Sequence, residues 1–160
     1  MFEEVFKIVK EKYQNDTILL VVTAEDNVPS VRSVDSFFYE DSFWVVTDLS
    51  CNYVKQIQKN PKVMISDGGH NRFWCDAVIT GHPLDSVNLS IREVYLQVFH
   101  HWYKEVNNEA LKTVCFIKAT PYKGYVHKDK LGYRFNKLEN TLSISEITHH
   151  IDVKLEPFWE

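Results

Sequence analysis

The side chains of this sequence with the clearest capacity for chemistry are thiols, neighbouring histidines and one arginine in an alternating stretch. Cys51 falls at the start of an expected short helix, and a helix N-terminus stabilises a thiolate. The alternative is a small side chain that fills space, the more common role of cysteine. Cys75 and Cys115 lie in apolar stretches and are expected in the core. An odd cysteine count without CxxC spacing predicts neither a disulfide framework nor a zinc site.

The histidine pairs His100-His101 and His149-His150 raise the question of a metal site. Adjacent helical residues point about 100° apart, so a neighbouring pair does not chelate from one face. HExxH is absent, and no metal site is expected. The motifs GxSxG, GxGxxG and Walker A are absent too. Serine hydrolysis, Rossmann-type dinucleotide binding and P-loop nucleotide hydrolysis therefore lack support.

Arg32 belongs to an alternating stretch, residues 30–39, that is typical of a strand lining a site. One face of this strand would hold Val31, Ser33, Asp35 and Phe37, and the other would hold Arg32, Val34, Ser36 and Phe38. Further on, Thr47, Asp48 and Ser50 precede a short helix expected at about residues 51–59. Asp48 and Ser50 are both able helix caps. A purely structural cap and turn, and a surface position for Arg32, stay open as alternatives.

The elements expected around these residues are short strands joined by hairpins, with few helices. A first helix covers residues 1–14, and a long one covers 85–105. Its apolar stripe consists of Leu89, Val94, Val98, Trp102 and Val106, with Ile91, Tyr95, Phe99 and Tyr103 close by. Strands are expected at 17–23, 30–39, 43–47, 62–66, 72–80, 113–119 and 124–127, with weaker ones at 133–135 and 141–145. Turns fall at 25–29 and 40–41. No βαβ rhythm is present, which predicts a mainly β, antiparallel sheet or barrel with peripheral helices.

Length and charge narrow the class of protein. A chain of 160 residues fits a single domain, 1–160, and 44% hydrophobic residues can form a core. The net charge of −4 disfavours nucleic-acid binding, and no polybasic membrane anchor is present. The N-terminal stretch is acidic where a signal peptide is basic, and no membrane span is expected. These features predict a cytoplasmic protein.

The most informative stretch runs from Val28 to Val63. It contains P-x-V-R, then an aliphatic strand ending in threonine, then a short helix with V-K-Q-I followed by N-P-x-V. Later come a W-x-D…ITG strand and the VCFIKATP…GYV pair. This order resembles the pyridoxamine 5'-phosphate oxidase-like superfamily, especially its small bacterial general-stress and nitroimidazole-resistance members. The resemblance spans most of the chain and rests on the combined order of elements.

The resemblance implies an FMN-binding, six-stranded antiparallel split β-barrel. It also implies a homodimer with FMN at the interface. The FMN-binding positions carried over are Arg32, Ser33, Val34, Thr47, Asp48, Ser50, Cys51, Asn52 and Tyr53. A helix N-terminus and an arginine suit a phosphate, and the flavin ring needs apolar walls. The walls could come from Phe37, Phe38, Trp74 or Trp102.

The sequence departs from the family at the expected phosphate site. Many relatives have a lysine in the stretch where this chain has Cys51 and Tyr53, and Asn52 replaces an arginine of the oxidases. Arg32 is then the only cation expected at the phosphate. The resemblance implies an FMN-dependent oxidoreductase acting on a small-molecule substrate, with no catalytic residue assigned. The alternatives are a non-catalytic flavin- or haem-binding module linked to stress, and a dimer that has lost its flavin.

Overall fold

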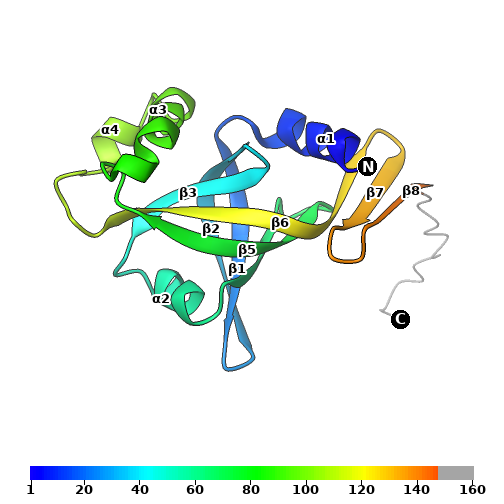
Figure 1. Cartoon of the computed structure of the whole chain (residues 1–160), viewed down its shortest axis with the longest axis horizontal. Helices are drawn as coiled ribbons and strands as arrows, with labels where there is room; N and C mark the ends of the chain where they lie inside the picture. The colour runs from blue at the N-terminus through cyan, green and yellow to red at the C-terminus, as the bar shows by residue number, and fades with distance from the viewer. Residues whose placement is uncertain (148–160) are drawn as a thin grey trace, which may run out of the picture.

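A closed antiparallel β-barrel forms the centre of the molecule in the computed structural model, which describes residues 1–147 (Figure 1). The strand order is β3-β2-β1-β4-β5-β6, and β3 pairs with β6 to close the barrel. β7 and β8 extend the sheet beyond β6. The strands are β1 (Thr17–Glu25), β2 (Val28–Tyr39), β3 (Ser42–Asp48), β4 (Lys62–Ser66), β5 (Arg72–Gly81), β6 (Val114–Lys128), β7 (Leu131–Asn136) and β8 (Thr141–Glu146). The mainly β, antiparallel barrel predicted from the sequence is confirmed.

The first two β-hairpins, β1–β2 and β2–β3, are each joined by a two-residue turn. Asp26 and Asn27 join β1 to β2 with φ angles of 51° and 64°, and Glu40 and Asp41 join β2 to β3 with 46° and 56°. Positive φ at both central residues follows the twist of the flanking strands. The turn expected at residues 25–29 is therefore shorter than predicted, and β2 begins earlier, at Val28.

One strand, β6, replaces the two strands expected at 113–119 and 124–127. The gap expected between them contains Pro121, and proline cannot donate to a strand ladder. In the structure Pro121 lies opposite Cys75, where the β5–β6 register shifts. The missing N–H therefore falls at an irregularity of the sheet, and the strand continues through it.

The prediction of one long helix at residues 85–105 is wrong. The chain instead forms a 3-10 turn, η1 (Ser86–Asn88), then α3 (Leu89–Val98) and α4 (Tyr103–Val106). The break lies where the Trp102 indole donates to Asp16 at 2.8 Å, which ties this segment to the start of β1. The expected apolar stripe is confirmed only in part: Leu89 and Val106 are 50% and 71% exposed, whereas Val94, Val98 and Trp102 pack against the buried rings. The buried positions are Ile91, Tyr95, Phe99 and Tyr103.

Two hydrophobic cores lie on the two sides of the barrel wall. The barrel core includes Leu19, Phe38, Val45 and Cys75 and is covered by α1 (Glu3–Tyr13) and α2 (Asn52–Lys59). The second core, here called the aromatic layer, lies under α3 and α4 and consists of Phe37, Trp44, Ile91, Tyr95, Phe99, Tyr103 and Phe116. None of the helices in residues 1–147 combines the length and apolar character needed to cross a membrane.

Several expectations for individual side chains can be compared with these cores. Cys75 and Cys115 are fully buried, as predicted. Phe37 is 0% exposed and cannot wall an open flavin groove, so that expectation is wrong for Phe37. Phe38 is 2% exposed and borders a surface cavity beside α1. The pair His149-His150 lies outside the described residues.

Candidate functional site

The residues expected to bind a cofactor gather mainly where α2 crosses the rim of the barrel. The helix buries Val54 and Ile57 in the barrel core, which fixes the helix against the strands. Its C-terminus is set by Pro61, which disfavours a helical conformation for the preceding residue. This placement brings Tyr53, at the start of α2, next to Arg32 of β2.

Arg32 is half-buried and bonded to both strand and helix. Its guanidinium donates to the Thr23 hydroxyl at 2.6 Å and to the Gln56 amide oxygen at 3.3 Å. The guanidinium carbon lies 4.9 Å from the centre of the Tyr53 ring, a cation–π distance. Burial lowers the pKa of Arg32, while Tyr53 acts in the opposite sense. Arg32 is therefore not a freely solvated surface arginine.

Tyr53 connects Arg32 with Thr47 at the end of β3. Thr47 lies close enough to the phenol of Tyr53 to lower its pKa. Burial nevertheless raises the pKa of Tyr53 to about 12, so the phenol is neutral at physiological pH. Residues from β2, β3 and α2 thus meet around one aromatic ring.

Asp48 contributes a negative charge next to the same helix. Its carboxylate accepts hydrogen bonds from the Ser50 N–H at 2.8 Å and the Ser50 hydroxyl at 2.6 Å. It also accepts one from the Thr113 hydroxyl at 2.5 Å. The hydrogen bonds from Ser50 and Thr113 lower the pKa of Asp48. Both donors of Ser50 are therefore already used by an internal carboxylate.

The N-terminus of α2 keeps donors available. Cys51 is the N-cap residue, and its side chain makes no capping hydrogen bond. Within the described part of the chain, the backbone N–H groups of Asn52 and Tyr53 have no hydrogen-bond acceptor. Unpaired N–H groups and the positive end of the helix dipole favour an anion at this position.

Three predicted residues lie apart from this cluster or turn away from it. Ser33 is exposed on the outer face of β2, whereas Val34 packs against the barrel core. Trp74 lies on the outer face of β5, with the Lys123 ammonium 5.3 Å from its ring centre. Trp74 makes no aromatic or hydrogen-bonding contact with the other predicted residues in the described chain.

The sequence interpretation missed Thr23, Gln56 and Thr113, which hold Arg32 and Asp48 in place. Gln56 had a local signal, because it lies one helical turn beyond Asn52 on the short helix. Thr23 and Thr113 had none, since each becomes a neighbour only through strand pairing. Thr23 is close to Arg32 through the β1–β2 register, and Thr113 is close to Asp48 through the β3–β6 pairing.

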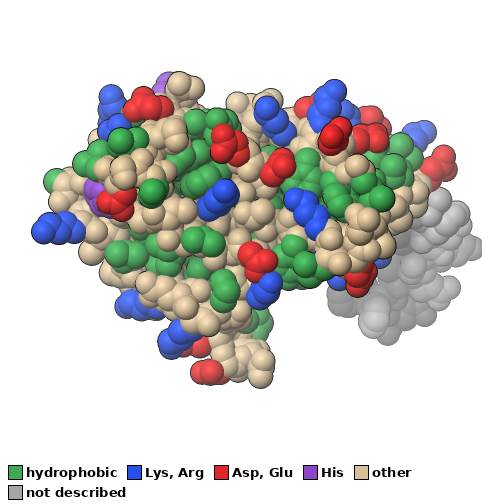
Figure 2. All heavy atoms as spheres, in the orientation of Figure 1, with side chains coloured by type: hydrophobic (Ala, Val, Ile, Leu, Met, Phe, Trp, Pro, Cys, Tyr) green, Lys and Arg blue, Asp and Glu red, His purple; other side chains and the backbone are tan. Residues whose placement is uncertain are grey.

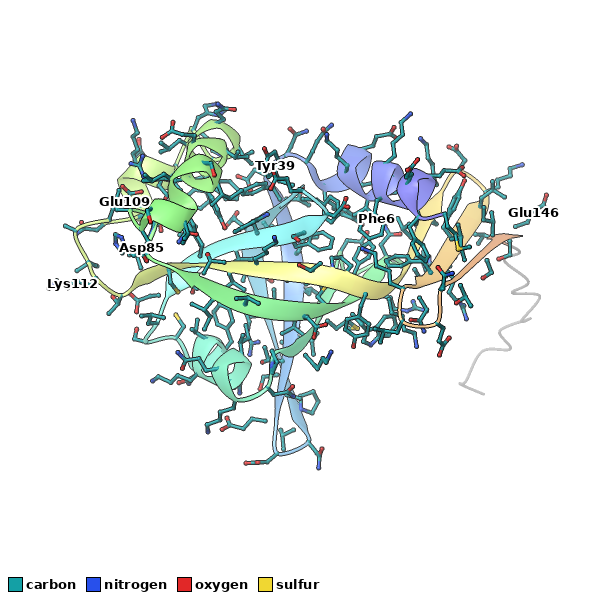
Figure 3. All side chains as sticks on the ribbon, in the orientation of Figure 1. Phe6, Tyr39, Asp85, Glu109, Lys112 and Glu146 are labelled. Carbon is teal, nitrogen blue, oxygen red and sulfur yellow. The ribbon has the colours of Figure 1, made fainter. Side chains whose placement is uncertain are left out.

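The surface near the cluster is hollowed on one side. A cavity of about 510 Å³ is lined by Leu49, Gly81, His82, Asp85, Glu109 and Lys112. Figure 3 labels Asp85, Glu109 and Lys112 at this end of the molecule, beside α3 and α4. Since Leu49 directly precedes Ser50, this cavity adjoins the N-terminus of α2. A larger cavity of about 760 Å³ lies beside α1 near Phe6 and Tyr39, and Phe38 is the one predicted residue that lines it.

The closed six-stranded barrel with a short helix across its rim is the split barrel of pyridoxamine 5'-phosphate oxidase-like proteins, as the sequence predicted. A NimC/NimA family protein from Clostridium acetobutylicum is 18% identical, with a TM-score of 0.56 over 88% of this chain and 94% of that one. General Stress Protein 26 from Bacillus anthracis is 15% identical, with a TM-score of 0.57 over 78% and 93%.

A pyridoxamine 5'-phosphate oxidase-related, FMN-binding protein from Nostoc punctiforme is 14% identical, with a TM-score of 0.54 over 92% of this chain and 96% of that one. At these identities the likeness shows the fold. No protein-family model matches the sequence, and no curated protein matches it either.

Proposed function

We propose that the protein binds FMN at the α2 rim of the barrel and acts as an oxidoreductase on a small organic substrate. The observation that carries this proposal is the meeting of Arg32, Thr47 and the uncapped N-terminus of α2 around Tyr53. A solved protein with the same fold is an FMN-binding protein. The proposal places the cofactor's phosphate at this cluster.

The donors at the rim fit a phosphate group. The unpaired N–H groups of Asn52 and Tyr53 supply hydrogen bonds along the helix axis, where the dipole favours negative charge. Arg32 supplies a permanent positive charge one helical turn further along, through its contact with Gln56. Asp48 opposes binding, because its ionised carboxylate repels a phosphate. The proposal therefore predicts moderate affinity for FMN.

The flavin ring needs apolar surface, and the proposal takes it from a second copy of the chain. The outer face of the barrel carries an exposed apolar row in which Val31 pairs with Val22 and Val22 pairs with Met64. Val31 is 62% exposed, and nearby Ile18 is 68% exposed. On the side drawn in Figure 2, where β5 and β6 lie nearest the viewer, apolar side chains likewise reach the surface between charged ones. A homodimer through the apolar row would bury these side chains.

The chain's own contribution is grip and orientation. A bound flavin would supply hydride transfer to or from the substrate. Tyr53 is neutral, and its ring lies 4.9 Å from the Arg32 guanidinium carbon, which helps to orient Arg32. The cavity next to Leu49 offers room for a small substrate beside the cofactor. The free thiols of Cys51, Cys75 and Cys115 suit a reducing compartment, in agreement with a cytoplasmic location.

A second candidate is a dimeric module that binds no flavin. The observation that favours it is Asp48, which already uses both donors of Ser50. In this case the hydrogen-bond network at the rim would serve only to hold α2 on the barrel.

The two candidates differ in a flavin titration. The purified protein is mixed with FMN, desalted and examined by visible absorbance. Retention of the oxidised flavin bands supports the first candidate, and steady oxidation of reduced nicotinamide then supports an enzyme over a carrier. A featureless spectrum after desalting, together with no quenching of flavin fluorescence on mixing, would leave the second candidate. Sedimentation of the wild type and of Val31→Lys tests the dimer, since a lysine in the apolar row should give monomers.

A further inference from the structure

The outer face of the sheet changes character from one side of the barrel to the other. Over β1, β2 and β4 it is the apolar row described above. Over β5, β6 and β7 it holds a group here called the cationic face, made of Arg72, Trp74, Lys123, Tyr125 and Arg134. Cross-strand register places them together, since Arg72 pairs with Tyr125, Tyr125 with Arg134, and Trp74 with Lys123.

Among the residues that the structure describes, the cations of this face have no carboxylate partner. Arg72, Lys123 and Arg134 are exposed, and none forms an ion pair with any residue in 1–147. By contrast, Lys62 in the next cross-strand row is paired with Asp76. Beyond Arg134 the same face continues onto β8 with Ser143, and beyond Lys123 it continues with Asn136 and Thr141. These rows contain no acidic side chain, although the whole chain has a net charge of −4.

Each aromatic ring of the face lies beside a mobile cation. The Arg72 and Arg134 guanidinium carbons lie 5.3 and 5.9 Å from the centre of the Tyr125 ring. The Lys123 ammonium lies 5.3 Å from the centre of the Trp74 ring. Because these cations are on exposed, flexible side chains, they can turn toward an anion and leave the rings free for stacking. Trp74 and Tyr125 are diagonal neighbours across adjacent strands, roughly 7–8 Å apart.

We propose that the cationic face binds single-stranded nucleic acid. Stacking rings that alternate with unpaired cations on an open sheet are what a flexible strand of bases and phosphates requires. The rings and cations extend over three neighbouring strands, which favours an extended strand of bases over a small ligand. A duplex is disfavoured because its bases are not free to stack on Trp74 and Tyr125. The net charge of −4 argues against nucleic-acid binding only if charge is spread evenly over the surface. Here the positive charges of the cationic face are grouped together.

The test measures fluorescence anisotropy of a short labelled oligothymidylate with the full chain. Wild type should bind the strand at low salt, with a slope of log K against log salt of about −2 if three phosphates are contacted. Arg72→Gln/Lys123→Gln/Arg134→Gln should weaken binding by about tenfold or more. The matched control Lys12→Gln/Lys104→Gln/Lys112→Gln changes the net charge equally and should leave binding within about twofold.

A second variant separates stacking from charge. Tyr125→Leu should weaken the single strand by about five- to hundredfold while keeping all cations. Absence of binding by wild type at low salt would overturn the proposal, as would equal loss in the control variant or equal affinity for a duplex. If the charge variant instead changes the sedimentation coefficient and not oligonucleotide binding, the face is an interface between copies of the chain. None of these measurements depends on bound flavin, so this proposal and the flavin proposal can fail separately.

Discussion

Two helical segments cover the same barrel in different ways. α3 and α4 cover it with aromatic rings, and Tyr95 of α3 stacks on Phe116 of β6 at 4.0 Å with an angle of 6° between the ring planes. Phe37 and Phe99 meet Tyr95 at edge-on or tilted angles. α2 covers its part of the barrel with two buried aliphatic side chains and a polar network around Arg32.

The difference separates stability from binding. Aromatic pairs contribute beyond the area they bury, so the aromatic layer is suited to hold the fold together. The α2 rim has few buried apolar side chains and several polar ones. The backbone N–H groups of Asn52 and Tyr53 remain there without an acceptor among the described residues. Substitutions in the aromatic layer should therefore change the free energy of unfolding most. Substitutions at the rim should change ligand affinity most.

The largest expected effect is on stability, from Phe99→Ala. Phe99 is fully buried and contacts the rings of Phe37, Tyr95 and Trp102. Truncation leaves a cavity and should lower the free energy of unfolding by about 3–5 kcal/mol. Urea denaturation measures it, with Phe99→Leu as a milder variant that should keep the protein folded. A loss below 1 kcal/mol would mean that the aromatic layer is not the main stabilising cover.

The next effect is on binding, from Arg32→Gln at the α2 rim. Loss of the charge-assisted contact should weaken FMN by about ten- to hundredfold, or about 1.5–3 kcal/mol. Lys104→Gln removes the same charge from an exposed position on α4 and should leave FMN affinity unchanged. Arg32→Lys should recover part of the affinity. Equal affinity for wild type and Arg32→Gln would place the phosphate elsewhere.

Glu109 connects α3 and α4 because its carboxylate accepts hydrogen bonds from a residue of each helix. It accepts two hydrogen bonds from Arg92 of α3, both at 2.8 Å, and one from the Tyr103 hydroxyl of α4. The hydrogen bonds from Arg92 lower the pKa of Glu109 below its ordinary value of 4.5. A carboxylate with a lowered folded-state pKa stabilises the fold above its unfolded-state pKa, and this contribution is lost as pH falls through the folded value.

Glu109→Gln should therefore lower the free energy of unfolding at neutral pH by about 1.5–3 kcal/mol. The variant should also lose less stability than wild type as pH falls below about 4.5. Thermal unfolding followed over a pH series measures both effects. Glu105→Gln, at an exposed position of α4, is the control and should behave as wild type. Parallel pH curves for wild type and Glu109→Gln would contradict the assigned cause.

The α2 rim could be predicted from the sequence because its signals are local. The P-x-V-R strand, the threonine that ends the next strand and the caps before a short helix all lie within a few residues of the site they form. What could not be predicted is which donors are already used. Asp48 is bonded by Thr113, which lies far along the sequence and becomes a neighbour only when β3 pairs with β6.

The α3–α4 cover was predicted less well for a physical reason. Apolar side chains occur on all sides of residues 89–106, so periodicity alone does not select the buried face. The face is selected by the shape of the partner, a group of rings on β2, β3 and β6 that accepts Tyr95 and Phe99. At the break between α3 and α4 the Trp102 indole donates to Asp16, a contact that sequence spacing does not indicate.

The test with the smallest expected effect replaces a tyrosine by phenylalanine in the aromatic layer and at the α2 rim. The Tyr95 hydroxyl is buried and has no hydrogen-bond partner among the described residues. Burial also holds its pKa far above the ordinary value. Tyr95→Phe removes an unsatisfied polar group and should raise the free energy of unfolding by about 1 kcal/mol. Tyr53→Phe removes a hydroxyl that lies beside Thr47 in the polar network and should lower it by about 1 kcal/mol. Urea denaturation measures both changes in the free energy of unfolding. Changes of opposite sign would confirm that the hydroxyl stabilises the fold at the α2 rim and destabilises it in the aromatic layer. Changes of the same sign would contradict that distinction.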